Sequence, residues 1–505
     1  MAASPNLPDV SLERLPQELL VRIASFLTTA ELGPLRGTCK NIERQLFDTF
    51  AREFFTKRQF MIEHESLEAL VGISRHPGLA SKLSEVIIGT DMLMPEEVLL
   101  NSRALNSRAE RSVLLSTGLA CEMLVEAFSN LPNLRTIGLR DYSGTGRFRD
   151  GESARWRSWG WSLSSGTRRD GSDGLLPLIL VALAQSKARP TDVAVFLRRH
   201  PQLRYDDFQL PAGPRGIAVA SVLAELRTLM LAISGDGSEL FQLSDSLAPW
   251  NVYNDKNFGE LPLRRFLQQT PKLEVLRLNF ENDQFFGHRI IDWLGRPVTA
   301  LSATRLPSDL PTPPVQLCSL ETLDLGMTNV NGGSLVRVLT KFDLESINLW
   351  KVTLQCPGPT STSQDCWAEF LLQLSTSLPA SCRIRYLMIG SCDQFHYTQT
   401  QPSSYGYRAP ALRFVPEGTD RAGKIKAIKD FKIAFKAQYT GKPIHQWLRD
   451  KSELTFVPGI HSEAIPTFIS DSESDSELDG EEDAMDEEAD EDDNDGEDDV
   501  QVLSD

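Results

Sequence analysis

The residue types that most often carry catalysis are scattered along this sequence. Seven histidines stand singly, and no motif of a phosphate-binding loop, a zinc protease or a serine hydrolase is present. The seven cysteines contain no C-x-x-C pair, and the closest lie ten residues apart, so we expect reduced thiols and neither a disulfide framework nor a zinc site. The sequence therefore predicts a binding protein, not an enzyme, with no cofactor.

An arginine- and tryptophan-rich segment is the first candidate for binding chemistry. Residues 141–174 combine six arginines with Trp156, Trp159 and Trp161, a mixture that can hold single-stranded nucleic acid by charge and stacking. The alternative is an ordered insert whose tryptophans pack on the edge of the neighbouring domain. We favour the insert, because the chain outside its acidic end is nearly neutral and no RNA-binding motif is visible.

The acidic end of the chain is the second candidate. Residues 471–505 hold 20 Asp and Glu of the total 69 and no Lys or Arg, so the remaining 49 acidic and 52 basic residues give residues 1–470 a charge of +3. Such a segment cannot bury a core, and we expect residues 461–505 to be a disordered tail. Phosphorylation by an acid-directed kinase is predicted at the four serines that have an acid three residues on, Ser470, Ser472, Ser474 and Ser476.

The element that begins the chain is a group of three short helices. Pro16 suits the first turn of a helix, and apolar residues then recur at three- and four-residue steps. Thr28 and Glu31 form a capping-box pattern that starts a second helix, and a third runs through Ile42 to Phe55. Three helices in about 45 residues cannot bury this much apolar surface among themselves, so a partner or the next domain must cover the remainder.

Residues 15–40 resemble the F-box, with L-P-x-E-L-L-x-x-I-x-S-F-L followed by x-E-L-x-x-L-x-x-x-C-K. The resemblance implies contact with the Skp adaptor and, through it, a cullin–RING ubiquitin ligase. Carried over position by position, the adaptor-binding residues are Leu15, Pro16, Leu19, Ile23, Leu27, Leu32, Leu35 and Cys39. Two positions depart from the family: Ile42 replaces its tryptophan, and Pro34 requires the second helix to start near Glu31. The residues that follow resemble a group of fungal F-box proteins.

One strand pattern, L-x-x-L-x-L with aliphatic substitutions, recurs through residues 80–392. Its copies are Leu83-Val86-Ile88, Leu134-Ile137-Leu139, Leu226-Leu229-Leu231, Leu273-Leu276-Leu278, Leu320-Leu323-Leu325, Leu344-Ile347-Leu349 and Ile384-Leu387-Ile389. Three of them follow an amphipathic helix and a proline. This order resembles the leucine-rich repeat and implies an irregular solenoid, although the family's ninth-position Asn or Cys appears only as Cys392. The alternative is an unrelated α/β domain with several parallel strands.

Side chains between and just after the leucines must point away from the core, because a strand alternates its faces. In a solenoid this face is the usual binding surface, so the sequence predicts target contacts there. The candidates are Arg140, Arg277, Asn279, Asp324, Asn348 and Trp350.

Two further segments lie near the end of the repeats. Residues 396–416, rich in Tyr, Ser, Gln and Pro, are expected to form a loop. Lysines and apolar residues alternate between Lys424 and Lys436 at helical spacing. We expect a terminal helix that covers the last repeat; the alternative is a helix that meets a membrane or an acidic partner.

These patterns together predict an α/β protein. Residues 1–10 are expected to be disordered, 11–58 to form the F-box, 59–460 the repeat domain with inserts at 141–174 and 396–416, and 461–505 the acidic tail. The predicted function is substrate recognition in an SCF-type ligase in the cytoplasm or nucleus, with no membrane contact and no nucleic acid. Two alternatives stay open: a scaffold that holds basic partners, and an F-box protein that assembles no active ligase.

Overall fold

The computed structural model describes thirteen stretches of the chain. They are residues 12–90, 102–141, 148–150, 174–197, 203–234, 260–281, 287–298, 312–356, 365–396, 407–408, 412–415, 436–439 and 442–456. The chain divides into two compact units, Met1–Glu463 and Ala464–Asp505. The second unit, with the four predicted phosphorylation serines, lies outside the described residues, as do residues 1–10 and the three tryptophans of the insert.

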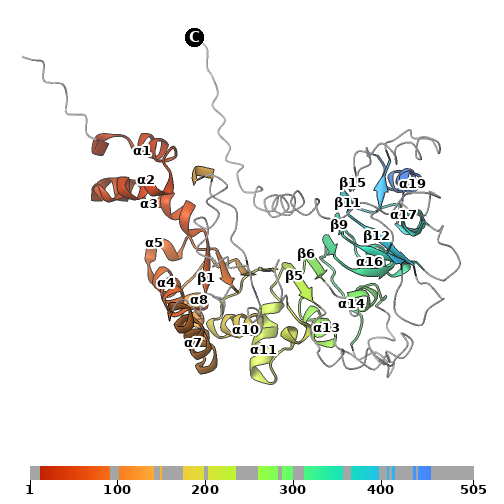
Figure 1. The fold of residues 1–505 in the computed structure, drawn as a ribbon, viewed down its shortest axis with the longest axis horizontal. Coiled ribbons are helices and arrows are strands. Elements are labelled where there is room, and N and C mark those ends of the chain that lie inside the picture. Colours follow the sequence, from red (N-terminus) through yellow and green to blue (C-terminus); the bar gives the residue numbers. More distant parts are fainter. Residues whose placement is uncertain are drawn as a thin grey trace, which may run out of the picture. The chain divides into compact units, whose positions relative to one another are not determined.

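The described elements are helices and strands in alternation, so the predicted α/β class is confirmed (Figure 1). The α-helices are α1 (Gln17–Ala24), α2 (Thr29–Gly37), α3 (Lys40–Phe55), α4 (His64–Arg75), α5 (Pro77–Ala80), α7 (Ser102–Thr117), α8 (Leu119–Ser129), α10 (Leu175–Ser186), α11 (Pro214–Leu223), α13 (Leu261–Leu267), α14 (Gly287–Leu294), α16 (Gly332–Lys341), α17 (Cys366–Ser377) and α19 (Ile444–Leu454). Short 3-10 helices are η1 (Leu12–Arg14), η2 (Phe148–Asp150) and η4 (Tyr205–Phe208).

The strands form one large sheet and two small ones. They are β1 (Lys57–Met61), β2 (Glu85–Gly89), β3 (Thr136–Arg140), β4 (Asp192–Phe196), β5 (Thr228–Ser234), β6 (Val275–Glu281), β7 (Thr322–Gly326), β8 (Asn329–Asn331), β9 (Ser346–Trp350), β10 (Thr353–Cys356), β11 (Tyr386–Gly390), β12 (Asp393–His396), β13 (Tyr407–Arg408), β14 (Arg413–Phe414), β15 (Lys436–Gln438) and β16 (Thr455–Phe456).

The large sheet has ten strands in the order β1-β2-β3-β4-β5-β6-β7-β9-β11-β15. The first nine pair in parallel and follow chain order, and β15 closes the edge antiparallel to β11. All seven copies of the aliphatic pattern form strands of this sheet. The sequence missed β1 and β4, where other residues replace the leading leucine.

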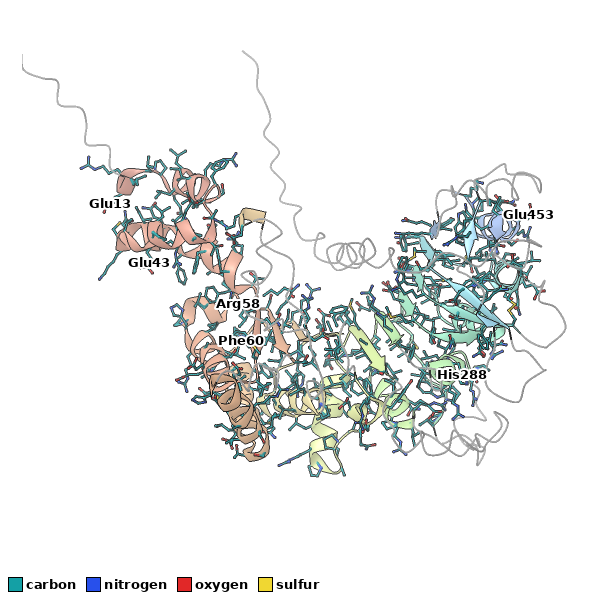
Figure 2. The ribbon with its side chains drawn as sticks, in the orientation of Figure 1. Glu13, Glu43, Arg58, Phe60, His288 and Glu453 are labelled. Carbon is teal, nitrogen blue, oxygen red and sulfur yellow. A yellow bond between two sulfur atoms is a disulfide. The ribbon has the colours of Figure 1, made fainter. Side chains whose placement is uncertain are left out.

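The register of the sheet aligns the aliphatic pattern across neighbouring strands. Ile137 pairs with Val193, and the same row continues through Leu229, Leu276 and Leu323. These side chains are buried in one core with the helices, and Phe60 of β1 joins it (Figure 2). A parallel strand needs a crossover before its neighbour, and the helices that follow the strands make these crossovers.

Residues 12–55 form a separate cluster, called here the helical module. α1, α2 and α3 pack around Leu20, Leu32, Ile42, Leu46 and Phe54. The predicted capping box is confirmed, because the Glu31 carboxylate accepts the Thr28 N–H at 2.9 Å. The expectation that α2 starts near Glu31 is wrong: it begins at Thr29, so Pro34 lies inside the helix and one ladder hydrogen bond is lost.

A second sheet is formed by the segments that follow the last three parallel strands of the large sheet. Strands β8, β10 and β12 follow β7, β9 and β11 after a turn, and the four-stranded order is β13-β12-β10-β8. Each turn contains a non-glycine residue in the left-handed region, Met327, Lys351 or Ser391. The Met327 N–H donates to the Trp350 carbonyl and the Lys351 N–H to the Gly390 carbonyl, both at 3.0 Å, so these two turns are held by the end of the next strand. The next residues, Thr328, Val352 and Cys392, are buried at the ninth pattern position.

The C-terminal predictions need two corrections. Residues 396–416 are not wholly a loop, because they contain β13 and β14, which pair with β12 and β16. The predicted helix over 424–436 lies largely outside the described residues, and its last residue, Lys436, begins strand β15. The last parallel strand, β11, pairs with β15, and α19 packs on α17 with Trp447 and Leu448 buried in the core.

The expectation of seven reduced cysteines is wrong for one pair. Cys356 at the end of β10 and Cys366 at the start of α17 form a disulfide, and both are buried. The sequence separation did not reveal this pair, because the approach of the two cysteines depends on the packing of α17 against β10. The other described cysteines are thiols, and burial raises the pKa of Cys392 to about 12.

Among the described helices, none is long and apolar enough by itself to cross a membrane. The segments Ala109–Thr117 and Leu119–Ser129 meet the length and composition of a span only as a pair, and they are bent by 72°.

One buried ion pair generates a stability prediction. The Arg264 guanidinium lies 2.7 Å from the Glu260 carboxylate, and their side chains are only 6% and 3% exposed. The substitution Arg264→Ala would leave Glu260 buried with a weaker partner, Arg289 at 3.9 Å. We expect a loss of about 3–5 kcal/mol in the free energy of unfolding, measured by urea denaturation.

The exposed pair Lys272 and Glu225, at the same 2.7 Å separation, supplies the control. Lys272→Ala should cost no more than about 1 kcal/mol, because solvent screens the interaction. Equal losses for the two variants would contradict the role given to the buried pair.

Candidate functional site

The helical module exposes a row of large apolar side chains. Leu19 is 51% exposed, Ile23 39% and Phe26 72%, and Leu12 of η1 is 48% exposed. The positions 19, 23 and 26 lie on one side of α1 and its C-terminal turn, while the intervening Leu20 and Ala24 are buried in the module core. Leu12, Pro16, Leu19, Ile23 and Phe26 are called here the apolar face.

The structure divides the eight predicted adaptor residues into three groups. Pro16, Leu19 and Ile23 are exposed on the apolar face. Leu15, Leu27, Leu35 and Cys39 are partly buried, and the Cys39 Sγ accepts the Ile42 N–H at the start of α3. Leu32 is only 3% exposed and belongs to the module core. Its side chain therefore supports the fold of the module.

Leu12 and Phe26 are functional candidates that the sequence prediction left out of its set. Phe26 lies beyond the last residue of α1, where spacing alone does not decide whether a side chain turns inward. The guanidinium of Arg22 lies 5.0 Å from the centroid of its ring. Exposed apolar side chains gathered on one short segment, here Leu12 to Phe26, are typical of a protein-binding surface.

The six predicted target residues all lie on strands of the large sheet, on the side turned away from the helices. This side is called here the outer face. Arg277, Asp324 and Asn348 share one register row across β6, β7 and β9. Asn279 and Trp350 stand two positions after Arg277 and Asn348 on the same strands, so they lie on the same side of the sheet. Arg140 follows the buried Leu139 of β3 and therefore lies on that side as well.

The outer face joins three of these residues into a polar cluster. The Asn348 amide donates to the Asp324 carboxylate at 2.6 Å, and the Arg277 Nε lies 3.8 Å from the same carboxylate. Burial raises the pKa of Asp324, although Arg277 and Asn348 both favour its charged form. The carboxylate is therefore poorly hydrated, and a donor group of a partner can strengthen its hydrogen bonding.

An aromatic residue that the sequence prediction missed connects the two arginines of the outer face. The guanidinium carbons of Arg140 and Arg277 lie 5.6 Å and 5.9 Å from the centroid of the Phe196 ring. Phe196 ends β4, and a relaxed form of the strand pattern, Pro190-x-x-Val193-x-Val195, was the signal that could have identified it. Arginine over an aromatic ring adds a cation–π attraction that aligns the guanidinium.

Two glycines on the outer face give room to large neighbours. A Cβ at Gly390 would lie 2.3 Å from the Trp350 ring, and one at Gly326 would lie 2.2 Å from the Asn279 Oδ1. Trp350 and Asn279 therefore each occupy the space beside a glycine of the next strand. The Trp350 ring is partly exposed in this position, so its flat surface is available to a partner.

Within the described residues, no group of three or more His, Cys, Asp or Glu side chains is placed to hold a metal ion. In that part of the chain, the candidate functional surfaces are the apolar face and the cluster of polar and aromatic side chains on the outer face. The cluster of the outer face contains Trp, Phe and Arg, residue types that are enriched in protein–protein interfaces.

Comparisons with known proteins leave these two surfaces as the main guide to function. No protein-family model matches the chain, and no curated protein matches its sequence at a significant level.

Proposed function

We propose that the chain is the substrate-recognition subunit of an SCF-type cullin–RING ubiquitin ligase. The observation that carries the proposal is the placement of the F-box-like residues: Leu19 and Ile23 are exposed on the apolar face, and Leu20 and Leu32 hold the module together. An F-box needs this division, because it must fold by itself and still offer apolar anchors to the Skp adaptor.

The target is held, in this proposal, by an irregular leucine-rich-like solenoid. Support comes from nine parallel strands in chain order and from the helices that connect them. The partly exposed Arg277 and Trp350 of the outer face are the proposed anchors for the target, since Arg and Trp are frequent energetic hot spots.

The chemical step belongs, in this proposal, to other subunits. The chain raises the effective concentration of a target lysine near the ubiquitin-charged enzyme by binding both the adaptor and the target. An F-box subunit without an active ligase would bind the adaptor but not recruit cullin, so co-purification of cullin separates that alternative.

A scaffold that holds basic partners is the second candidate. The observation in its favour is the acidic segment from Asp471 to Asp505, whose 20 acidic residues carry the net negative charge of the chain. Such a segment attracts basic proteins by long-range electrostatics and needs no ligase.

The first functional prediction concerns the apolar face. Leu19→Ala and Ile23→Ala should each weaken binding to the purified Skp adaptor about 30-fold, because truncating a central apolar anchor costs about 2 kcal/mol. Binding is measured by isothermal titration calorimetry. Ile217→Ala supplies the control, because Ile217 is 72% exposed on α11, outside the module. Unchanged adaptor affinity in the Leu19/Ile23 double variant would exclude the F-box assignment.

The second functional prediction concerns target capture on the outer face. Trp350→Ala and Arg277→Glu should abolish the proximity labelling of target proteins and leave adaptor binding intact. Gly390→Ala tests the position of the Trp350 ring, because a Cβ at residue 390 would force the ring to move. Arg227→Ala is the control, because the Arg227 side chain is 58% exposed in a surface pair with Glu274. Retention of the same targets by all three outer-face variants would show that targets bind elsewhere.

The third functional prediction concerns the acidic segment. Deletion of residues 471–505 should leave the thermal stability nearly unchanged, because the segment has no apolar periodicity. Binding to polylysine should weaken, most at low salt, where charges act over the longest range. The scaffold candidate replaces the ligase proposal if the deletion abolishes binding to all partners found with the full chain while the Leu19→Ala and Ile23→Ala variants keep those partners.

A further inference from the structure

The arginine-rich insert after β3 contacts the helical module. Its described residues include η2, Phe148–Asp150, and the side chain of Arg149 is only 9% exposed. This contact was not among the sequence expectations for the insert, which were nucleic-acid binding and packing of its tryptophans on the edge of the neighbouring domain; the tryptophans lie outside the described residues. It joins residues that are about a hundred positions apart in the chain.

Arg149 binds two of the three module helices. Its guanidinium meets both carboxylate oxygens of Glu53 on α3, with the Nη2–Oε2 separation at 2.5 Å. The Nη1 atom donates to the carbonyls of Ala24 at 3.0 Å and Leu27 at 2.6 Å. These carbonyls lie at the end of α1 and just beyond it, where a cation is favoured; the Ala24 carbonyl also accepts the Leu27 N–H at 3.3 Å.

Asp150 binds the remaining helix. Its carboxylate accepts the backbone N–H of Thr29 at 2.8 Å and also the Thr29 hydroxyl. Thr29 is the first residue of α2, so an anion there complements the positive end of the helix. Arg149 and Asp150 thus place opposite charges at the two facing helix ends, which gives the contact a specific orientation.

The module has a second attachment to the sheet, but it holds only α3. α3 leads directly into β1, and the ammonium of Lys82 lies 2.7 Å from the Asp48 carboxylate. The Thr56 carbonyl accepts the Ser84 and Glu85 N–H groups at the edge of β2. Within the described residues, the hydrogen bonds that tie α1 and α2 to a segment beyond the module come from Arg149 and Asp150.

We propose that Arg149 and Asp150 are positioning residues that fasten α1 and α2 to the sheet and so set the orientation of the adaptor-binding face relative to the target-binding outer face. This inference rests on the proposed function for its consequence, because ubiquitin transfer requires a suitable distance between adaptor and target. The physical contact itself does not depend on that function, and its test is therefore made with and without the Skp adaptor.

The test measures distances between bio-orthogonal spin labels at Ala30 on α2 and Glu122 on α8, two exposed positions. We expect one narrow distance distribution for the native chain and a broadened distribution for Arg149→Ala and for Asp150→Asn. Arg52→Ala is the matched control, since Arg52 is the neighbour of Glu53 on α3 and its side chain is 71% exposed. Its distribution should remain narrow.

Hydrogen exchange of α1–α3 in the same variants separates positioning from folding. Preserved protection in these helices together with a broadened distribution supports the proposal. Loss of protection throughout the module in Arg149→Ala would contradict it, because Arg149 would then be part of the module's own fold. An unchanged distance distribution in both variants would overturn it as well. If the adaptor fails to bind the native chain but the distribution still broadens, the ligase function fails and the positioning role stands.

Discussion

The fold depends on one constraint, the burial of an aliphatic row on every parallel strand against the helix layer. Ile137, Leu229 and Leu323 belong to the same row of the register, and their side chains are at most 1% exposed. A slip of one residue between two strands would turn the whole aliphatic set of a strand to the other side of the sheet. The core therefore fixes the register, and the register in turn decides which side chains reach the outer face.

The two proposed binding surfaces arise from this arrangement in different ways. The outer face receives its residues from the alternation of the strands, so Arg277, Asp324 and Asn348 meet although they lie on three separate strands. The apolar face arises because the short helices of the module cannot enclose all their large side chains. In the proposed ligase, this excess of apolar surface is what the adaptor covers. The chain then acts through binding at two places and leaves the chemistry to its partners.

Much of the fold could be predicted from the sequence because its strongest signal is local. Seven strands were found from the period-two aliphatic pattern, and the capping residues Thr28 and Glu31 predicted the boundary between α1 and α2. β1 was missed because Arg58, labelled in Figure 2, occupies the position where Val86 stands in the next strand. The Arg58 guanidinium instead lies 5.7 Å from the centroid of the Phe55 ring. β4 was missed because Pro190 replaces the leading leucine.

The remaining features depend on contacts between distant residues, which sequence patterns do not encode. The outer-face position of Trp350 was predicted, but its placement over Gly390 requires the register of β9 and β11. The contact of Arg149 with Glu53 requires the insert to return to the module. The same is true of Leu32, whose place in the motif does not reveal that α3 covers it. The spacing of residues along the chain thus predicts on which side of a helix or strand a side chain lies. Contacts between elements decide whether that side chain is exposed.

Hydrogen exchange of the chain in the presence and absence of the Skp adaptor tests the central claim most directly. The account predicts that adaptor binding slows exchange in η1, α1 and the turn to Thr28 and leaves the strands β6, β7 and β9 unchanged. Protection of those strands without protection of α1, or no change anywhere at saturating adaptor, would contradict the assignment of the helical module as the adaptor-binding site.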